Sequence, residues 1–156
     1  ALLTRSRSVR SLTVPILTSG ALIEVHLGFS DARRRVMQRQ GRPVPPPAKA
    51  TLLIDTGASM SLVDEALMRA LQLTATSLTS YHSSSTSGIA QQCNVYDVSL
   101  VLGGVATANS LRIDPLPVMA TAFINHPFEG LLGRDVLSRL QMAWSGPTQS
   151  LTLSYP

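Results

Sequence analysis

Cysteine and histidine are too sparse in this sequence to build a metal centre or a disulfide framework. The only cysteine among the 156 residues is Cys93, so neither an internal disulfide nor a cysteine metal cluster can form. The three histidines, His26, His82 and His126, lie far apart in sequence, and none has the spacing of a metal-ligand pair. We therefore predict no metal and no other cofactor.

Long hydrophobic runs are also missing. No apolar segment reaches the roughly 18 residues needed to cross a bilayer, and the basic N-terminus ALLTRSRSVR lacks the apolar centre of a signal peptide. These absences favour a cytoplasmic location and limit any membrane contact to a segment outside this chain. The first residue is Ala1 rather than Met, which suggests trimming from a longer precursor.

Charged residues are scarce, at 14% of the chain, whereas 44% of the residues are hydrophobic. This composition is sufficient for a packed core, and the length suits a single domain over residues 1–156.

The few charges are unevenly distributed. Residues 1–50 contain nine basic and two acidic residues, whereas residues 51–156 contain four basic and seven acidic residues. A basic region can attract nucleic acid, but no aromatic side chains lie among Arg33, Arg34 and Arg35 to stack on bases. We therefore interpret residues 30–49 as a basic, proline-rich surface loop and do not expect nucleic acid as a partner.

Alternation of apolar and polar residues predicts a chain made mainly of short strands. In the segment 22–29, Ile23, Val25 and Leu27 share one face. Pro15 places a weaker strand at a sheet edge, because proline lacks a backbone donor. The predicted strands are 11–17, 22–29, 50–54, 95–102, 106–113, 116–124, 131–133 and 150–155.

Two short helices and several turns connect these strands. The first helix is predicted over residues 64–73, with Asp64 at its N-terminus and with Val63, Leu67, Ala70 and Leu71 on its inner face. The second helix follows Gly133 and uses Val136, Leu137 and Leu140. Turns are predicted at 18–20 and at Gly103-Gly104, and a polar hairpin over 79–95 has its turn near residues 85–88. Together these elements predict a mainly β, closed or nearly closed sheet after an N-terminal arm, residues 1–20.

The stretch LLIDTGAS places Asp55 directly after a buried strand. A carboxylate held rigidly at a strand end suits acid–base chemistry, but one carboxylate cannot act as acid and base in the same step. No other acidic residue repeats the strand-Asp-Thr-Gly context. Either the segment is an ordinary turn, or the partner of Asp55 is its own copy across the two-fold axis of a homodimer.

LLIDTGAS, followed about 75 residues later by GLLGRDVL, resembles the motifs of retropepsin-like aspartic peptidases, the single-domain relatives of pepsin. The similarity covers residues 22–155, and the long basic insertion is more similar to bacterial than to viral members. It implies a homodimeric, closed β-barrel with a flap hairpin. It also implies a polypeptide substrate, cleaved by a water molecule that two Asp55 carboxylates activate.

The resemblance also implies roles for residues around Asp55. Thr56 would form a hydrogen bond across the dimer axis, and Gly57 would border the cleft. Ala58 and Ser59 would complete the loop. The flap tip, which would close over the peptide, is formed by Thr86, Ser87, Gly88 and Ile89. The structural segment beside the site is formed by Leu132, Gly133, Arg134 and Asp135.

Two departures from the family pattern affect this loop. Viral members commonly have an acidic residue at the position of Ser59, paired with the arginine that corresponds to Arg134. Arg134 is therefore expected to pair with Asp135 or with a carboxylate across the dimer. Ala58 replaces the serine of pepsins, which removes one hydrogen bond to the carboxylate. We expect this loss to raise the pKa of the pair and to move the pH optimum towards mildly acidic or neutral values.

Two other functions fit the same sequence. One is a catalytically inactive module that keeps the fold for binding or dimerisation, and the other is a retroelement-type protein whose basic arm binds nucleic acid. Dimerisation is expected to cover the terminal strand, residues 150–155, which would otherwise be an exposed apolar edge. Cys93, Trp144 and the methionines are interpreted as packing residues.

Overall fold

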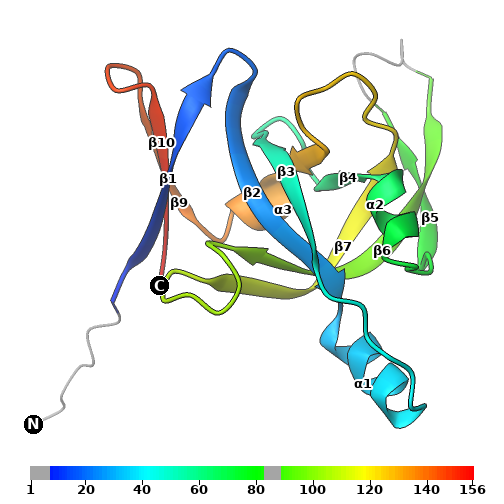
Figure 1. Ribbon diagram of the computed structural model, residues 1–156. Coiled ribbons are helices and arrows are strands. Elements are labelled where there is room, and N and C mark those ends of the chain that lie inside the picture. The colour runs from blue at the N-terminus through cyan, green and yellow to red at the C-terminus, as the bar shows by residue number, and fades with distance from the viewer. Residues whose placement is uncertain (1–7, 83–88) are drawn as a thin grey trace, which may run out of the picture.

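The computed structural model describes residues 8–82 and 89–156. Within these ranges the strands form one continuous, strongly curved sheet with three short helices (Figure 1). The elements in chain order are β1 (Arg10–Leu17), β2 (Gly20–Phe29), α1 (Asp31–Arg39), β3 (Ala48–Ile54), β4 (Leu62–Asp64), α2 (Glu65–Ala70), β5 (Ser77–Tyr81), β6 (Gln91–Leu102), β7 (Leu111–Thr121), β8 (Gly130–Leu132), α3 (Arg134–Leu137), β9 (Gln141–Ser145) and β10 (Ser150–Tyr155).

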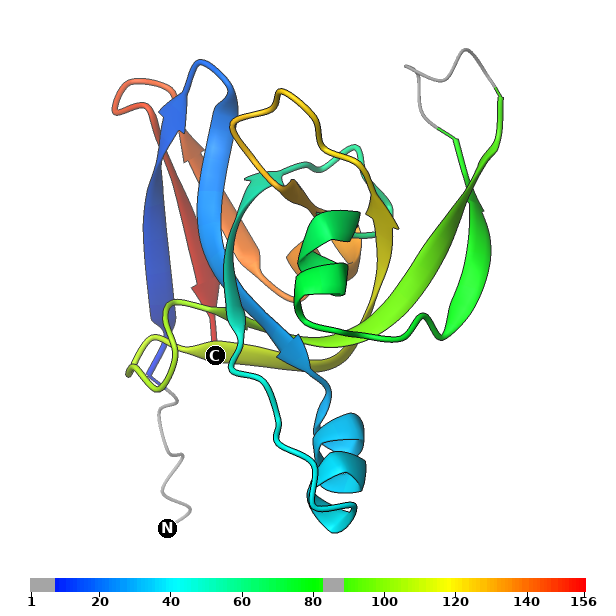
Figure 2. The same cartoon turned by 45° about the vertical axis from the view of Figure 1, so that its right-hand side comes forward.

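Six of the strands close into a barrel. The hydrogen-bonded order runs β6-β7-β4-β8-β3-β2, and β2 pairs back with β6. Closure is achieved because β2 pairs along both of its edges: its residues from Leu22 to Leu27 pair with β3, and those from Val25 to Phe29 pair with β6. The predicted mainly β, closed-barrel architecture is therefore confirmed (Figure 2).

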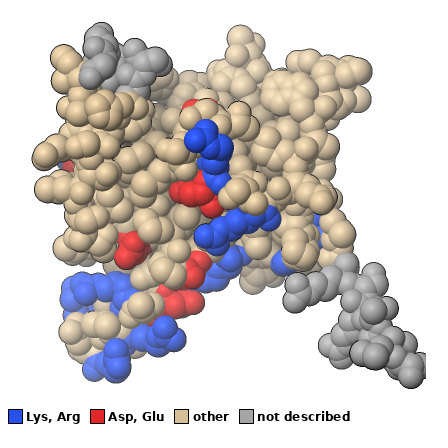
Figure 3. All heavy atoms as spheres, turned by 180° about the vertical axis from the view of Figure 1, so that it is seen from behind, with Lys and Arg blue, Asp and Glu red and all other residues tan. Residues whose placement is uncertain are grey.

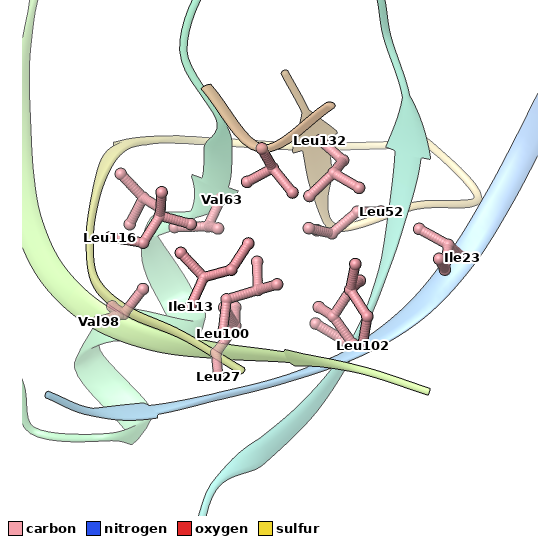
Figure 4. Close-up of a cluster of buried hydrophobic side chains, with 14 of the residues drawn as sticks. Ile23, Leu27, Leu52, Val63, Val98, Leu100, Leu102, Ile113, Leu116 and Leu132 are labelled. Carbon is pink, nitrogen blue, oxygen red and sulfur yellow. The ribbon is translucent and has the colours of Figure 1, made fainter. Parts of the chain in front are cut away.

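Aliphatic side chains from all six barrel strands fill the interior (Figure 4). Burying one such side chain contributes about 1.5–3 kcal/mol relative to leaving it in water. Met68 of α2 and Val136 of α3 also belong to this cluster, so both helices are held by the core. The labelled members in Figure 4 are Ile23, Leu27, Leu52, Val63, Val98, Leu100, Leu102, Ile113, Leu116 and Leu132.

Beyond the barrel, the sheet continues through β1, β10 and β9. Two predictions about its edges were wrong. Pro15 does not place β1 at an edge, because β1 pairs with β10 from Arg10 to Pro15 and reaches β2 only at Ile16 and Leu17. Proline is tolerated because no ladder with β2 is formed at that point. The terminal strand β10 is likewise covered on both sides, by β1 and by β9.

The outer edge of this extension is β9, which the sequence pattern did not indicate. Its residues are mostly exposed, including Trp144 at 62% and Met142 at 38%. Within the single chain, the interpretation of Trp144 and Met142 as packing residues is therefore wrong. The cross-strand partners of these two residues, Leu151 and Leu153, are fully buried. Trp144 and Met142 therefore extend the apolar face of the sheet to its exposed edge strand.

The segment predicted as two strands, 106–113 and 116–124, contains the single strand β7. Gly103-Gly104 begins a longer connection, because β7 starts only at Leu111. The strand passes through Pro115, which lies between the two predicted strands, and through Pro117, which lies near the start of the second. Its ladder with β6 is irregular at this point, with a register shift between Val98 and Leu100, and such a bulge tolerates the missing proline donors.

Residues 31–39 form the helix α1, whereas the whole segment 30–49 was predicted as a loop. The helix is stabilised from outside its own sequence. Ser30 caps its N-terminus, and the Asp31 N–H donates to the Asp114 carboxylate at 3.0 and 3.2 Å. Met37 is the residue of the helix whose side chain is buried. No helix in the described ranges is both long and apolar enough to cross a membrane.

The helix α2 is shorter than predicted. The residues just before the helix form strand β4, so Val63 belongs to a strand. Asp64 caps the helix, because its side chain accepts a hydrogen bond from the Ala66 N–H over 3.0 Å. Met68, not Ala70, is the side chain that α2 buries most deeply. The segment around Gly133 agrees with prediction: β8 is followed at once by α3.

Candidate active site

Asp55 lies at the point where β3 leaves the barrel. Ile54, the last residue of β3, is in register with Leu132 of the parallel strand β8. The Asp55 N–H then donates to the Leu132 carbonyl over 3.0 Å, which extends the parallel ladder by one residue. The start of the loop is therefore fixed to the barrel, with the Asp55 side chain half-buried.

Backbone amides shape the loop that follows. The Gly57 N–H donates to Asp55 Oδ1 over 2.8 Å, and the Ala58 N–H donates to the Asp55 carbonyl over 3.3 Å. A Cβ at position 57 would lie 3.0 Å from the same carboxylate oxygen, so glycine permits this close approach. The amide fixes one oxygen of Asp55, and no hydrogen bond within the described ranges uses Oδ2.

Arg134 ties the second half of the site to this loop. Its Nη1 donates to the Thr56 carbonyl over 2.8 Å and to the Gly57 carbonyl over 3.3 Å. Its backbone N–H donates to the Ala58 carbonyl over 2.9 Å. Of the two partners expected for Arg134, Asp135 is therefore wrong, and a carboxylate across the dimer stays a prediction. Ser59 supplies no carboxylate, and the guanidinium donates to main-chain oxygens of the loop.

Asp135 instead bonds to Ser61, a residue that the sequence reasoning missed. Asp135 Oδ2 accepts from the Ser61 N–H over 2.9 Å, and Oδ1 accepts from the Ser61 hydroxyl over 2.7 Å. The same hydroxyl oxygen accepts from the Gly133 N–H over 3.0 Å. Ser61 is fully buried. It therefore joins the two motif segments, and its only sequence signal is a small polar residue just before the buried pair Leu62-Val63.

Gly133 explains why the two segments can lie so close. A Cβ at this position would approach the Met60 carbonyl group to 2.8 Å and the Ala58 carbonyl oxygen to 3.0 Å. These contacts are with backbone, which cannot move aside without displacing the loop. Any residue larger than glycine would push the Asp55 loop away from β8.

A cleft of about 640 Å³ opens beside Asp55. One wall is the loop itself, and another is the outer strand β5 with the residue after it. Asp55 is the only acidic residue among the described residues that line the cleft, and its floor is apolar. The lining residues are Asp55, Gly57, Ala58, Ser59, Met60, Leu62, Thr79, Ser80, Tyr81, His82, Met119 and Leu131.

The hairpin predicted over residues 79–95 is present in its described part. Strand β5 pairs with β6 from Ser77↔Val95 to Tyr81↔Gln91. In Figure 2 the hairpin stands away from the barrel. Residues 86–88 of the predicted flap tip lie outside the described residues. Ile89 is 71% exposed and does not line the cleft. Thr56, also predicted at the site, is exposed and contributes its carbonyl to Arg134.

A small apolar layer supports the floor of the cleft. Leu62, Cys93, Val95 and Met119 form a buried cluster, and Met60 packs against it. Burial raises the pKa of the Cys93 thiol above its ordinary value, and the nearby Glu65 carboxylate adds to this effect. The predicted packing role of Cys93 is consistent with this position.

The cleft residues outside the loop could not be identified from local sequence. Tyr81 and Met119 reach the site only because β5, β6 and β7 are consecutive in the sheet. A further aromatic group lies in the connection between β7 and β8, where the His126 ring stacks on Phe128 with centroids 5.0 Å apart. Within residues 8–82 and 89–156, no three His, Cys, Asp or Glu side chains are grouped as a metal site would require.

Comparisons with known proteins agree with this geometry. The solved structures that match include a retropepsin-like aspartic protease from Rickettsia conorii, with a TM-score of 0.59 and 16% identity over 99% of this chain and 98% of that one. At this identity the likeness shows the fold alone. No curated protein matches the sequence. A family model described as aspartyl protease matches residues 46–136, a segment that exceeds half of the chain and contains both motif segments; the chain therefore belongs to the aspartyl protease family.

Proposed function

We propose that this protein is an aspartic endopeptidase whose catalytic groups are two Asp55 carboxylates, one from each subunit of a homodimer. The observation that carries the proposal is the placement of Asp55. It lies in a cleft, on a loop fixed by Leu132, Gly57 and Arg134, with one carboxylate oxygen held by a backbone amide. Membership of the aspartyl protease family supports the same chemistry.

The requirement for a second copy follows from the chemistry of the step. One carboxylate removes a proton from the attacking water, while the other donates a proton to the carbonyl oxygen of the substrate. Two carboxylates that occupy one site share one proton, because they cannot both ionise; the aspartic protease dyad is a standard example of this effect. No second acidic side chain lines the cleft in the described part of the chain.

The edge strand β9 supports dimerisation. An unpaired sheet edge is normally covered or protected by charge, but β9 has the sequence Gln-Met-Ala-Trp-Ser and exposes Trp144 and Met142. Tryptophan is enriched among the residues that dominate binding energy at protein interfaces. We infer that a second copy covers β9, in place of the terminal strand to which the sequence first pointed.

The substrate we propose is an extended polypeptide. The hairpin β5–β6 borders the cleft and presents an outer strand edge, the kind of surface to which a peptide can add as a further strand. The apolar floor, with Met60, Leu62 and Met119, suits an apolar substrate side chain. A flap that closes over the peptide belongs to the same proposal.

The decisive experiment compares the wild type with Asp55→Asn on a peptide library, with and without a pepstatin-like inhibitor. The wild type should cleave and be inhibited, and the variant should lose cleavage while retaining the sedimentation coefficient of a dimer. An active monomer would rule out the shared pair. Equal, inhibitor-insensitive cleavage by both proteins would rule out Asp55 as the catalytic residue, and absence of cleavage by either would favour a binding module.

A further inference from the structure

A second cavity lies at the end of the barrel opposite Asp55. The helix α1 leaves the barrel after β2 and returns to the start of β3 through the proline-rich segment 43–47, whereas Asp55 follows the other end of β3. Figure 1 shows α1 projecting below the barrel. This helix lies outside the segment 46–136 that matches the family model, so the family's chemistry does not account for it.

The cavity between α1, the segment 43–47 and the end of α2 measures about 380 Å³. This volume is within the range of small-molecule sites. Its wall is apolar, and its charged groups are all of one sign: two guanidinium groups and no carboxylate. The lining residues are Phe29, Arg33, Met37, Arg42, Pro43, Val44, Pro45, Pro46 and Gln72.

The helix that forms one side of the cavity is firmly attached to the barrel. Asp114 of β7 accepts from the Asp31 N–H, and Arg112 bridges the two carboxylates, at 2.8 Å to Asp31 and 2.7 Å to Asp114. Met37 and Phe29 are buried against the cavity wall. The cavity is therefore preformed, so a ligand would not have to order the helix on binding.

The two arginines of the cavity have no internal counter-charge. Among the described residues, neither Arg33 nor Arg42 makes an ion pair, whereas their neighbour Arg34 lies 3.9 Å from Asp31. Figure 3 shows basic side chains gathered over the projecting part of the molecule that contains α1. Arg33 also lies in the first turn of α1, where the helix dipole disfavours a cation. The positive charge of Arg33 therefore does not stabilise this end of the helix.

Gln72, at the end of α2, lines the cavity from a backbone conformation that is costly for a residue with a side chain. It follows the C-cap of α2 with a φ of 56°, and the Leu73 N–H donates to the Met68 carbonyl over 3.0 Å. Glycine is the usual residue at this position of a helix end, because a side chain there is strained. Gln72 nevertheless retains a side chain and lines the cavity. Strained residues of this kind concentrate at ligand sites.

From this arrangement we infer that the cavity is a binding site for a small organic anion with an apolar body and one carboxylate or phosphate head group. The apolar body packs on Phe29, Met37 and Val44. The head group is bound by Arg33 and Arg42, because guanidinium groups match the planar oxygen pairs of carboxylates and phosphates.

Isothermal titration calorimetry at pH 7.5 and about 150 mM salt tests the site, because this ionic strength screens charges beyond about 8 Å. Three probes separate the head groups: octanoate, octyl phosphate and the neutral octanamide. We expect saturable one-to-one binding of at least one anion with Kd below about 1 mM, and at least tenfold weaker binding of octanamide. A preference between the two anions identifies the head group.

Two double variants of equal charge locate the binding. Arg33→Gln with Arg42→Gln should weaken anion binding at least tenfold, whereas Arg34→Gln with Arg35→Gln, outside the cavity lining, should change it less than threefold. Gln72→Gly should weaken it several-fold and leave peptide cleavage unchanged. Equal weakening by both double variants, or equal affinity for octanamide, would overturn the inference. Because Asp55→Asn should bind the probes normally, failure of this site and failure of the proposed peptidase are distinguishable.

Discussion

Replacing Ser61 by alanine should destabilise the fold more than any other loss of a single oxygen in the described part of the chain. The hydroxyl is fully buried, donates to Asp135 Oδ1 over 2.7 Å and accepts from the Gly133 N–H over 3.0 Å. A buried donor left without an acceptor costs about 1–3 kcal/mol, and a hydrogen bond to a charged group contributes about 1.5–3 kcal/mol. After partial relaxation, we expect a loss of about 3 kcal/mol in the free energy of unfolding.

Urea denaturation measures this loss. For an m-value of about 2 kcal/mol/M, the midpoint should fall by about 1.5 M. The matched control is Ser59→Ala, which removes an exposed hydroxyl from the same loop and should change the unfolding free energy by less than about 0.5 kcal/mol. Both variants must be measured at the same protein concentration, because the proposed dimerisation would add to apparent stability.

Enzyme kinetics provide a second measurement, which connects the hydrogen bonds of Ser61 to the Asp55 site. Ser61→Ala should also lower kcat/KM, because Asp135 and Gly133 hold the segment on which Asp55 rests. The reasoning would be refuted by a Ser61→Ala midpoint within 0.3 M of the Ser59→Ala midpoint. That result would mean that the bonds of the hydroxyl are replaced at no cost, and that the two motif segments do not depend on it.

Three further predictions follow from the site and its surroundings. Arg134→Gln removes two hydrogen bonds to the Asp55 loop and should lower kcat/KM by about 10–100-fold with less than about 1 kcal/mol lost in urea; wild-type kinetics would contradict the assigned role. Trp144→Glu places a charge on the exposed edge β9 and should weaken dimerisation at least 30-fold by sedimentation equilibrium, about 2 kcal/mol; an unchanged dimer would exclude β9 as the interface. Cys93 has a raised pKa through burial, so its neutral form is favoured in the folded state. Its contribution to stability should be present below the ordinary thiol pKa of about 8.5 and be lost as pH rises towards the folded value. Cys93→Ala should flatten the fall in unfolding midpoint between pH 8 and 10, and parallel profiles would contradict this.

The Asp55 loop and the barrel were accessible from sequence because their signals are local. Three aliphatic residues before Asp55, the Thr-Gly pair after it and the Leu-Leu-Gly segment downstream each describe a strand and the turn that follows it. The alternation in β2 is equally direct, since one of its faces lies in the core. These features predicted the family and the fold that the comparisons support.

The features that sequence could not predict depend on distant residues. The helix α1 is fixed by Asp114, more than 80 positions away, and its arginine-rich sequence alone gives little reason for a helix. The partner of Arg134 is a pair of carbonyl groups, which no side-chain pattern reveals. Strand β9 has too few residues for a periodic signal, and its pairing is decided by the strand that follows it.

The contacts that fix the Asp55 loop also determine when the site can exist during folding. The loop is held through Leu132, Arg134 and Asp135, each more than 70 positions downstream. Such long-range contacts form late, because the entropy of closing the intervening chain must first be overcome. A chain that has been synthesised beyond Asp55 but not yet as far as Asp135 therefore contains the Asp55 carboxylate but lacks the residues that hold its loop in place. The ability to cut peptides would appear only when the barrel closes, which protects the unfinished chain and its neighbours during synthesis.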